Sequence, residues 1–157
     1  TVSWEEISRL AEACGQAEKA DLNDGVFFHP ASMSEAMRRY LKEKNHVEGP
    51  MDWGLLFRAF YESLASAYAE TIREIQKATG KNLERIYIVG GGSSSRVLLR
   101  LMSESIGKPV VVCYGESTSM GNLAAQVKYR HPEYTLEDLR NIIRNSYRTE
   151  VIEPERG

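Results

Sequence analysis

Apolar residues in the first half of the chain recur every three to four positions in two separate stretches, the spacing of amphipathic helices. Ser3 and Glu6 form a capping box that predicts the start of the first helix. Ser32 and Glu35 repeat the pattern for a second helix, which we expect to end near Asn45. The apolar positions of the two helices are Ile7, Leu10, Ala11, Cys14, Met33, Met37, Tyr40 and Leu41.

A third and longer helix is predicted from about Asp52 to Thr79, since its apolar residues also follow a 3.6-residue period. Gly80 comes directly after it, where glycine commonly ends a helix. Residues 15–31 are expected to be irregular, because Asn23-Asp24-Gly25 is a strong turn signal.

The pattern then changes to short apolar runs typical of strands. Arg85–Val89 and Pro109–Tyr114 are rich in β-branched residues, and a helical pattern at Ser95–Ile106 separates them. This order predicts a right-handed βαβ unit with two parallel strands. Both strands are nearly all apolar, so we expect the sheet to be covered on both faces.

Two more helices follow, from Thr118 to about Arg130 and from Thr135 onward. The residues after Arg148 are polar, and we expect them to be frayed. We assign residues 1–150 to one domain and residues 151–157 to a polar tail. The fold class is α/β, helix-rich with a small parallel sheet. Two strands alone make a poor sheet, so we expect its remaining strands to lie outside this chain.

Composition excludes several classes of protein. The 157 residues carry a formal net charge of −2 with basic and acidic residues interspersed, which argues against a nucleic-acid surface. No apolar run approaches the roughly 20 residues that a membrane helix needs. Cys14 and Cys113 have no metal-like spacing and form no disulfide framework. We therefore expect a cytoplasmic protein that binds neither nucleic acid nor membrane.

The segment after the first predicted strand carries the clearest functional signal. Three glycines, Gly90 to Gly92, follow the strand, and Ser93-Ser94-Ser95 then lead into a helix. Glycine allows close approach of the backbone to a ligand, and a helix N-terminus attracts anions. Ser95 replaces the third glycine of a dinucleotide fingerprint, and the lysine of a P-loop is missing. The alternative is that the glycines only permit a tight turn.

A second turn, from Tyr114 to Asn122, follows the other strand at the same edge of the predicted sheet, where ligands of open α/β sheets bind. Glu116 in this turn either contacts a ligand or only complements a helix dipole, and the second interpretation is favoured. Gly121 is expected to allow close helix packing.

No catalytic or metal-binding constellation emerges from the sequence. The histidines lie in or beside loops, and the aspartates lie in turns or at helix starts, where capping explains them. Cys113 at a strand end is expected to be a small buried hydrophobic residue. The serine cluster has no nearby base, which favours anion contact over covalent chemistry. The histidines are His29, His46 and His131, and the aspartates are Asp21, Asp24, Asp52 and Asp138.

In order and spacing, the motifs of the chain resemble the C-terminal portion of FGGY-family carbohydrate kinases, and within that family the rhamnulokinases. The segments that carry the resemblance are Asn23-Asp24, Phe28, Pro30, Glu62–Ala65, Ile86–Ser93, Gly107–Val110 and Glu116–Asn122. It covers essentially the whole chain. It implies part of a ribonuclease-H-like fold, the fold of actin and related ATPases.

The resemblance implies that Gly90, Gly91, Gly92 and Ser93 hold ATP, with Ser95 adjoining. It also implies Mg²⁺ and a sugar substrate in the intact enzyme, and a catalytic aspartate upstream of the matching region. The chain departs from the rhamnulokinase pattern at a few positions and so does not specify the sugar. These positions are Ser94, Ser95, Leu99, Arg100 and Glu104.

The resulting expectation is a fragment of an ATP-dependent sugar kinase that phosphorylates a ketose hydroxyl. It would supply part of the nucleotide site and be inactive without the missing N-terminal portion. One alternative is an actin-like or chaperone-like interaction domain that uses nucleotide as a switch. Another is a stand-alone binding module whose glycine turn is purely structural.

Overall fold

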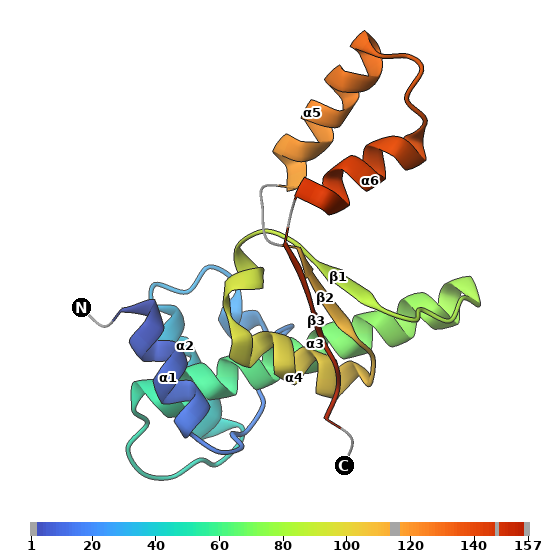
Figure 1. Cartoon of the computed structure of the whole chain (residues 1–157). Helices are drawn as coiled ribbons and strands as arrows, with labels where there is room; N and C mark the ends of the chain where they lie inside the picture. The colour runs from blue at the N-terminus through green and yellow to red at the C-terminus, as the bar shows by residue number, and fades with distance from the viewer. Residues whose placement is uncertain (1–2, 114–116, 147, 156–157) are drawn as a thin grey trace.

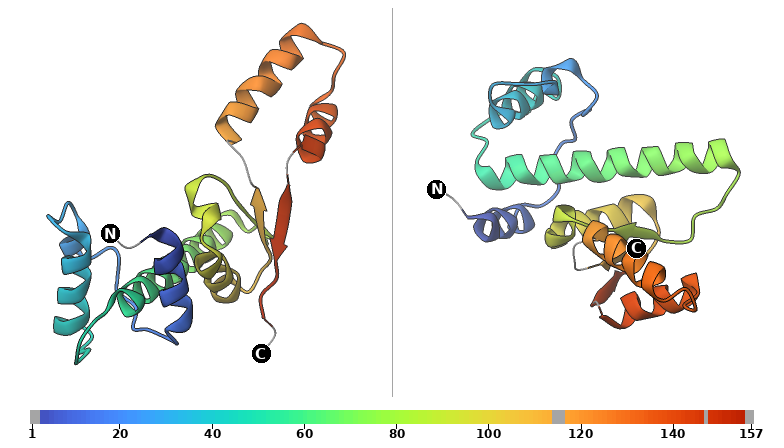
Figure 2. Two further views of the ribbon diagram at one scale, coloured as in Figure 1. Left: turned by 60° about the vertical axis from the view of Figure 1, so that its left-hand side comes forward. Right: turned by 90° about the horizontal axis from the view of Figure 1, so that it is seen from above.

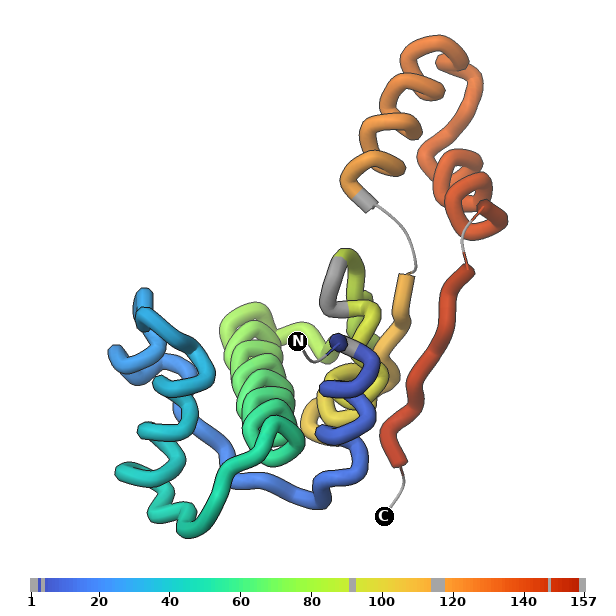
Figure 3. Tube along the Cα trace, turned by 90° about the vertical axis from the view of Figure 1, so that its left-hand side faces the viewer, coloured from blue at the N-terminus to red at the C-terminus, as the bar shows by residue number. Residues whose placement is uncertain are grey.

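The computed structural model describes residues 3–113, 117–146 and 148–155. Helix α3 (Trp53–Thr79) is the long central helix of the molecule, with other helices packed on two of its sides (Figure 1). Helices α1 (Trp4–Ala13) and α4 (Arg96–Ile106) lie along one side of it. Helix α2 (Met33–Glu43) and the short 3₁₀ turn η1 (Gly25–Phe27) lie on the other side, as Figure 3 shows.

The predicted helix ends are confirmed by their capping contacts. The Ser3 hydroxyl accepts from the backbone N–H of Glu6 at 3.2 Å and starts α1. Ser32 caps α2, and the Asp52 carboxylate caps α3. Gly80 ends α3 with a φ of 66°, a left-handed conformation that glycine adopts without steric cost.

The sheet has three strands: β1 (Ile86–Ile88), β2 (Val110–Cys113) and β3 (Thr149–Ile152). β1 and β2 are parallel, as predicted, and β3 runs antiparallel to β2. The expectation of a frayed tail after Arg148 is therefore wrong for β3. The edge of β2 that faces away from β1 supplies backbone hydrogen-bond partners for residues 149–152. The polar sequence of these residues does not reveal that partner.

The two faces of the sheet differ. Ile86 and Ile88 of β1 face the interior together with Val110 and Val112 of β2. On the opposite face, Tyr87 is 61% exposed. The expectation of a sheet covered on both faces is therefore wrong for β1 within the described residues.

Two apolar clusters stabilise the fold. The first joins α1, α3, α4 and the inner face of the sheet, with Leu99 and Val110 fully buried. The second joins α2 to the first turns of α3 and includes Met37 and Leu41. Ser63 of α3 links the second cluster to the preceding loop, because its hydroxyl accepts from the Ala20 N–H at 2.8 Å.

Helices α5 (Ser117–Arg130) and α6 (Leu136–Ser146) form a hairpin that projects from the rest of the molecule (Figures 1 and 2). Leu139 is the buried residue of α6. A Cβ at Gly121 would meet nothing within 4 Å, so the expectation that this glycine permits close packing is wrong. In the part of the chain that the structure describes, none of the helices combines the length and apolar character needed to cross a bilayer.

Candidate functional site

The glycine segment lies where the sequence predicts it, between the carboxyl end of β1 and the start of α4. Gly90 has φ 77° and ψ −159°, a backbone conformation that is essentially restricted to glycine. The next residues form a 3₁₀ turn, η2 (Gly91–Ser94). A Cβ added to Gly90 would meet nothing within 4 Å, so this glycine is required by its backbone angles rather than by close packing.

The hydroxyls of Ser93 and Ser95 have backbone partners within the segment. The Ser93 hydroxyl donates to the Gly90 carbonyl oxygen at 2.6 Å, and the side chain is buried. The Ser95 hydroxyl accepts from the Leu98 N–H at 3.4 Å and caps α4. Both hydroxyls thus shape the turn and the helix start. The assignment of Gly90, Gly91, Gly92, Ser93 and Ser95 to nucleotide binding stays a prediction.

A charged surface adjoins this segment. Arg96, the first residue of α4, forms an ion pair with Glu150 of β3. A hollow of about 290 Å³ beside this pair is also lined by Glu12, Arg100 and Glu153. Sequence reasoning missed this group because its members are distant in the chain. The sequence offered one signal for it. Arg96 lies in the first turn of its helix, where the helix dipole disfavours a positive charge, so an acidic partner could have been expected.

Residues 114–116 of the second turn, including Glu116, lie outside the described residues, so the interpretation of Glu116 stays untested. The described part of the segment begins at Ser117 with α5. The structure therefore shows one of the two predicted loops at this edge of the sheet.

The four aspartates of the chain all bond to backbone N–H groups, which confirms the prediction that they serve in turns and caps. Asp52 accepts from the Leu55 N–H at 2.9 Å, and Asp24 accepts from the Val26 N–H at 3.0 Å. Side-chain and backbone hydrogen bonds from Thr135 lower the pKa of Asp138.

The histidines and cysteines form no site within the described ranges. His131 Nδ1 lies 3.0 Å from a carboxylate oxygen of Glu133 in an exposed turn. Cys14 and Cys113 are free thiols. Among the described residues, no group of three or more His, Cys, Asp or Glu side chains is placed to hold a metal ion.

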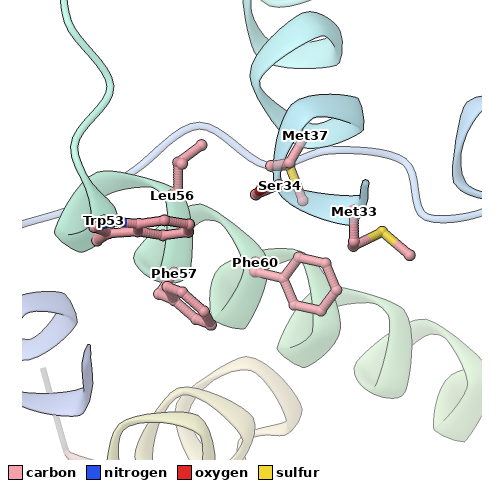
Figure 4. Close-up of a pocket in the computed structure, with 7 residues that line it drawn as sticks. All are labelled: Met33, Ser34, Met37, Trp53, Leu56, Phe57 and Phe60. Atoms are coloured by element: carbon pink, nitrogen blue, oxygen red, sulfur yellow. The ribbon is translucent and has the colours of Figure 1, made fainter. Parts of the chain in front are cut away.

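An apolar pocket of about 280 Å³ lies between α2 and the first turns of α3 (Figure 4). Its wall includes Met33, Met37, Phe57 and Phe60. From their helical spacing alone, these residues would be predicted to pack in the core and not to line a pocket. Trp53 at its rim is 40% exposed.

Residues 5–128 match the FGGY family of carbohydrate kinases, C-terminal domain. The chain belongs to this family. Family membership favours a kinase over a nucleotide-switched interaction domain or a stand-alone binding module. It also confirms the resemblance inferred from the glycine segment and the motifs around it.

The FGGY chain is similar to several rhamnulokinases. It is 30% identical to that of Oceanobacillus iheyensis over 139 residues, which cover 87% of this chain and 29% of the relative. It is 30% identical to the Bacillus subtilis enzyme, with coverage of 94% and 31%. For the Bacteroides thetaiotaomicron enzyme the identity is 26%, with coverage of 98% and 32%. The chain therefore spans less than a third of these relatives.

Among solved structures, the chain resembles the xylulose kinase from Rhodospirillum rubrum, with a TM-score of 0.56 and 22% identity. The match covers 69% of this chain and 22% of that one. This likeness shows the fold, which is part of the actin-like ATPase architecture, as the sequence motifs imply.

Proposed function

We propose that the chain is part of an ATP-dependent sugar kinase of the rhamnulokinase type and supplies part of its nucleotide site. The observation that carries the proposal is the Gly90 turn. Its glycine-only backbone joins the carboxyl end of β1 to the start of an 11-residue helix in a member of the FGGY family. A strand, a glycine turn and a helix N-terminus in this order form a common anion site.

In this proposal, the backbone from Gly90 to Gly92 lies against the nucleotide, since no side chain stands between the main chain and the ligand. Ser93 and Ser95 hold the turn in shape through the bonds described above, and their backbone groups adjoin the nucleotide. The open space beside Gly90 is compatible with a ligand at this position.

The chemistry of phosphoryl transfer is assigned to residues outside this chain. A general base must take the proton of the sugar hydroxyl, and an ionised carboxylate is suited to that role. The chain's four aspartates already cap helices or close turns. No Mg²⁺ ligand is assigned to the chain, because its described residues contain no group of three or more His, Cys, Asp or Glu side chains placed to hold a metal ion. We therefore expect the isolated chain to be inactive.

The experiment measures ADP release from ATP with L-rhamnulose and with D-xylulose as acceptors. The full-length gene product should release ADP in the presence of a ketose, and the 157-residue chain should not. Sugar-dependent ADP release by the pure chain would contradict the fragment assignment. No activity of the full-length product with any ketose would contradict the sugar kinase assignment.

Binding is tested separately by calorimetry with ATP and ADP on the full-length product. We expect nucleotide to bind with a ketose present or absent. The proposed location is the cytoplasm, which suits the free thiols of Cys14 and Cys113.

A further inference from the structure

Strand β3 lies along helix α4 and contacts it near both of its ends (Figure 1). At the start of α4, Arg96 forms an ion pair with Glu150. Farther along α4, the fully buried Ser103 hydroxyl lies 3.0 Å from the Ile152 carbonyl oxygen. Glu150 and Ile152 are two positions apart, so their side chains lie on one face of β3. This face of β3 therefore holds the helix that follows the glycine turn.

Arg96 lies where the helix dipole disfavours a positive charge. It is the first residue of α4 and follows Ser95, the residue that caps the helix. Side chains of a helix lean toward its N-terminus, which for Arg96 is the end where the glycine turn lies. The Arg96 side chain is 74% exposed. An arginine in this position is favourable when an anion binds beside the helix start.

The guanidinium of Arg96 retains N–H donors that Glu150 does not use. Of its five N–H groups, those on Nη2 face the Glu150 carboxylate. Within the described residues, this guanidinium forms no hydrogen bond to any other side chain or backbone group. The planar guanidinium binds carboxylate and phosphate oxygens in the same way. Arg96 can therefore contact Glu150 and a phosphate oxygen at the same time.

We propose that Arg96 contacts a phosphate group of the bound nucleotide and that Glu150 is the positioning residue that holds Arg96 in place. The inference rests on the proposed function, which puts the nucleotide at the Gly90 turn. The ion pair restrains a long side chain before the nucleotide binds, so less conformational entropy is lost on binding. The backbone N–H groups of the turn carry partial charges, whereas Arg96 adds a full positive charge beside them.

Arg100 provides a matched control on the same helix. Its guanidinium lies 3.8 Å from a carboxylate oxygen of Glu12 and 3.7 Å from one of Glu104, so two carboxylates already surround it. Four residues of helix place Arg100 about 6 Å farther along the helix axis from the glycine turn than Arg96. Loss of charge at Arg100 therefore tests whether any arginine on α4 affects nucleotide binding.

Calorimetric titration of the full-length gene product with ATP tests the proposal. Arg96→Gln should raise the Kd for ATP about 5- to 10-fold, as for an exposed charge-assisted contact, and Arg96→Lys should restore part of this loss. Glu150→Gln should raise the Kd about 2- to 5-fold, whereas Glu150→Asp should stay within about 2-fold of the parent. Arg100→Gln and Glu12→Gln should change the Kd by less than about 2-fold.

Three further measurements separate positioning from a loss of stability. In the Arg96→Gln background, Glu150→Gln should change the Kd by less than about 1.5-fold, because Glu150 acts through Arg96. Raising KCl from about 0.05 M to about 0.5 M should weaken ATP binding less in Arg96→Gln than in the parent, since salt screens charge contacts. In kinase assays, the KM for ATP should rise in both single variants, while the KM for the sugar should stay within about 2-fold of the parent.

An unchanged ATP affinity in Arg96→Gln, with ATP still bound by the parent, would overturn this inference alone. An equal loss of affinity in Arg100→Gln would overturn it too, because the effect would then belong to the surface charge of α4. Additive effects of Arg96→Gln and Glu150→Gln would refute the positioning role of Glu150. Failure of the parent to bind ATP would overturn the proposed function together with this inference.

Discussion

Gly90→Ala tests whether the glycine turn depends on the backbone angles of Gly90, because the added methyl group strains those angles without meeting a neighbouring atom. The φ of 77° and ψ of −159° at Gly90 are strained for any residue with a Cβ, although the added methyl group would meet no atom within 4 Å. Such conformations cost roughly 1–3 kcal/mol. For a chain of this size, that loss lowers the unfolding temperature by roughly 2–12 °C.

Two control variants locate the effect. Gly25→Ala adds a methyl group in open space at an ordinary φ, so we expect little change or a slight stabilisation. Gly80→Ala introduces strain at a φ of 66° at the far end of α3 and should cost about 1–2 kcal/mol.

The assays are thermal unfolding of the 157-residue chain and calorimetric ATP titration of the full-length product. If the turn holds nucleotide, Gly90→Ala weakens ATP binding by more than its loss of stability explains, whereas Gly80→Ala leaves ATP affinity unchanged. Equal ATP affinities for the Gly90 and Gly80 variants would refute the assignment of the turn to nucleotide. An unfolding temperature for Gly90→Ala equal to that of Gly25→Ala would refute the strain argument.

Three further predictions concern stability. Ser63→Ala should destabilise the chain by about 1–3 kcal/mol in urea unfolding, because it leaves the Ala20 N–H without its buried partner. Leu99→Ala should cost about 2–5 kcal/mol in the same assay, since Leu99 is fully buried and its removal leaves a cavity. Hydrogen bonds from Thr135 lower the pKa of Asp138 in the folded state, so its stabilisation of α6 is present above the ordinary value of 3.8 and is lost as the pH falls below it. Circular dichroism during acid titration measures this loss.

Each of these predictions has a matched control. Ser66→Ala tests the same substitution one helical turn after Ser63, at a half-buried position, and should change stability by less than about 0.5 kcal/mol. Leu123→Ala is the control for Leu99→Ala, because the Leu123 side chain is 52% exposed, and its loss of stability should be well below that of Leu99→Ala. Asp138→Asn should remove the acid-dependent part of the α6 signal. An unchanged acid titration in this variant would contradict the role of the carboxylate.

Much of the fold follows from local patterns. The α1, α2 and α3 starts were predicted from Ser3, Ser32 and Asp52, because a capping side chain and its backbone partner lie within three residues of each other. The end of α3 follows from Gly80 for the same reason. The parallel pairing of β1 and β2 follows from the short helical connection between two apolar runs.

The contacts between distant segments could not be predicted in this way. β3 pairs with β2 across the α5–α6 hairpin, and nothing in the sequence from Thr149 to Ile152 marks that partner. Ser103 of α4 lies 3.0 Å from the carbonyl oxygen of Ile152, a bond that exists only once β3 is in place. The Arg96–Glu150 ion pair depends on the same strand.

The sequence by itself determined the helices, the parallel strand pair, the glycine turn and the family, because periodicity, caps and glycine angles act over a few neighbouring residues. Only the tertiary structure decided which face of the sheet stays open, where β3 pairs and which residues surround the turn. Those outcomes depend on which surfaces meet when the chain folds, and residues far apart in sequence carry no local record of that meeting.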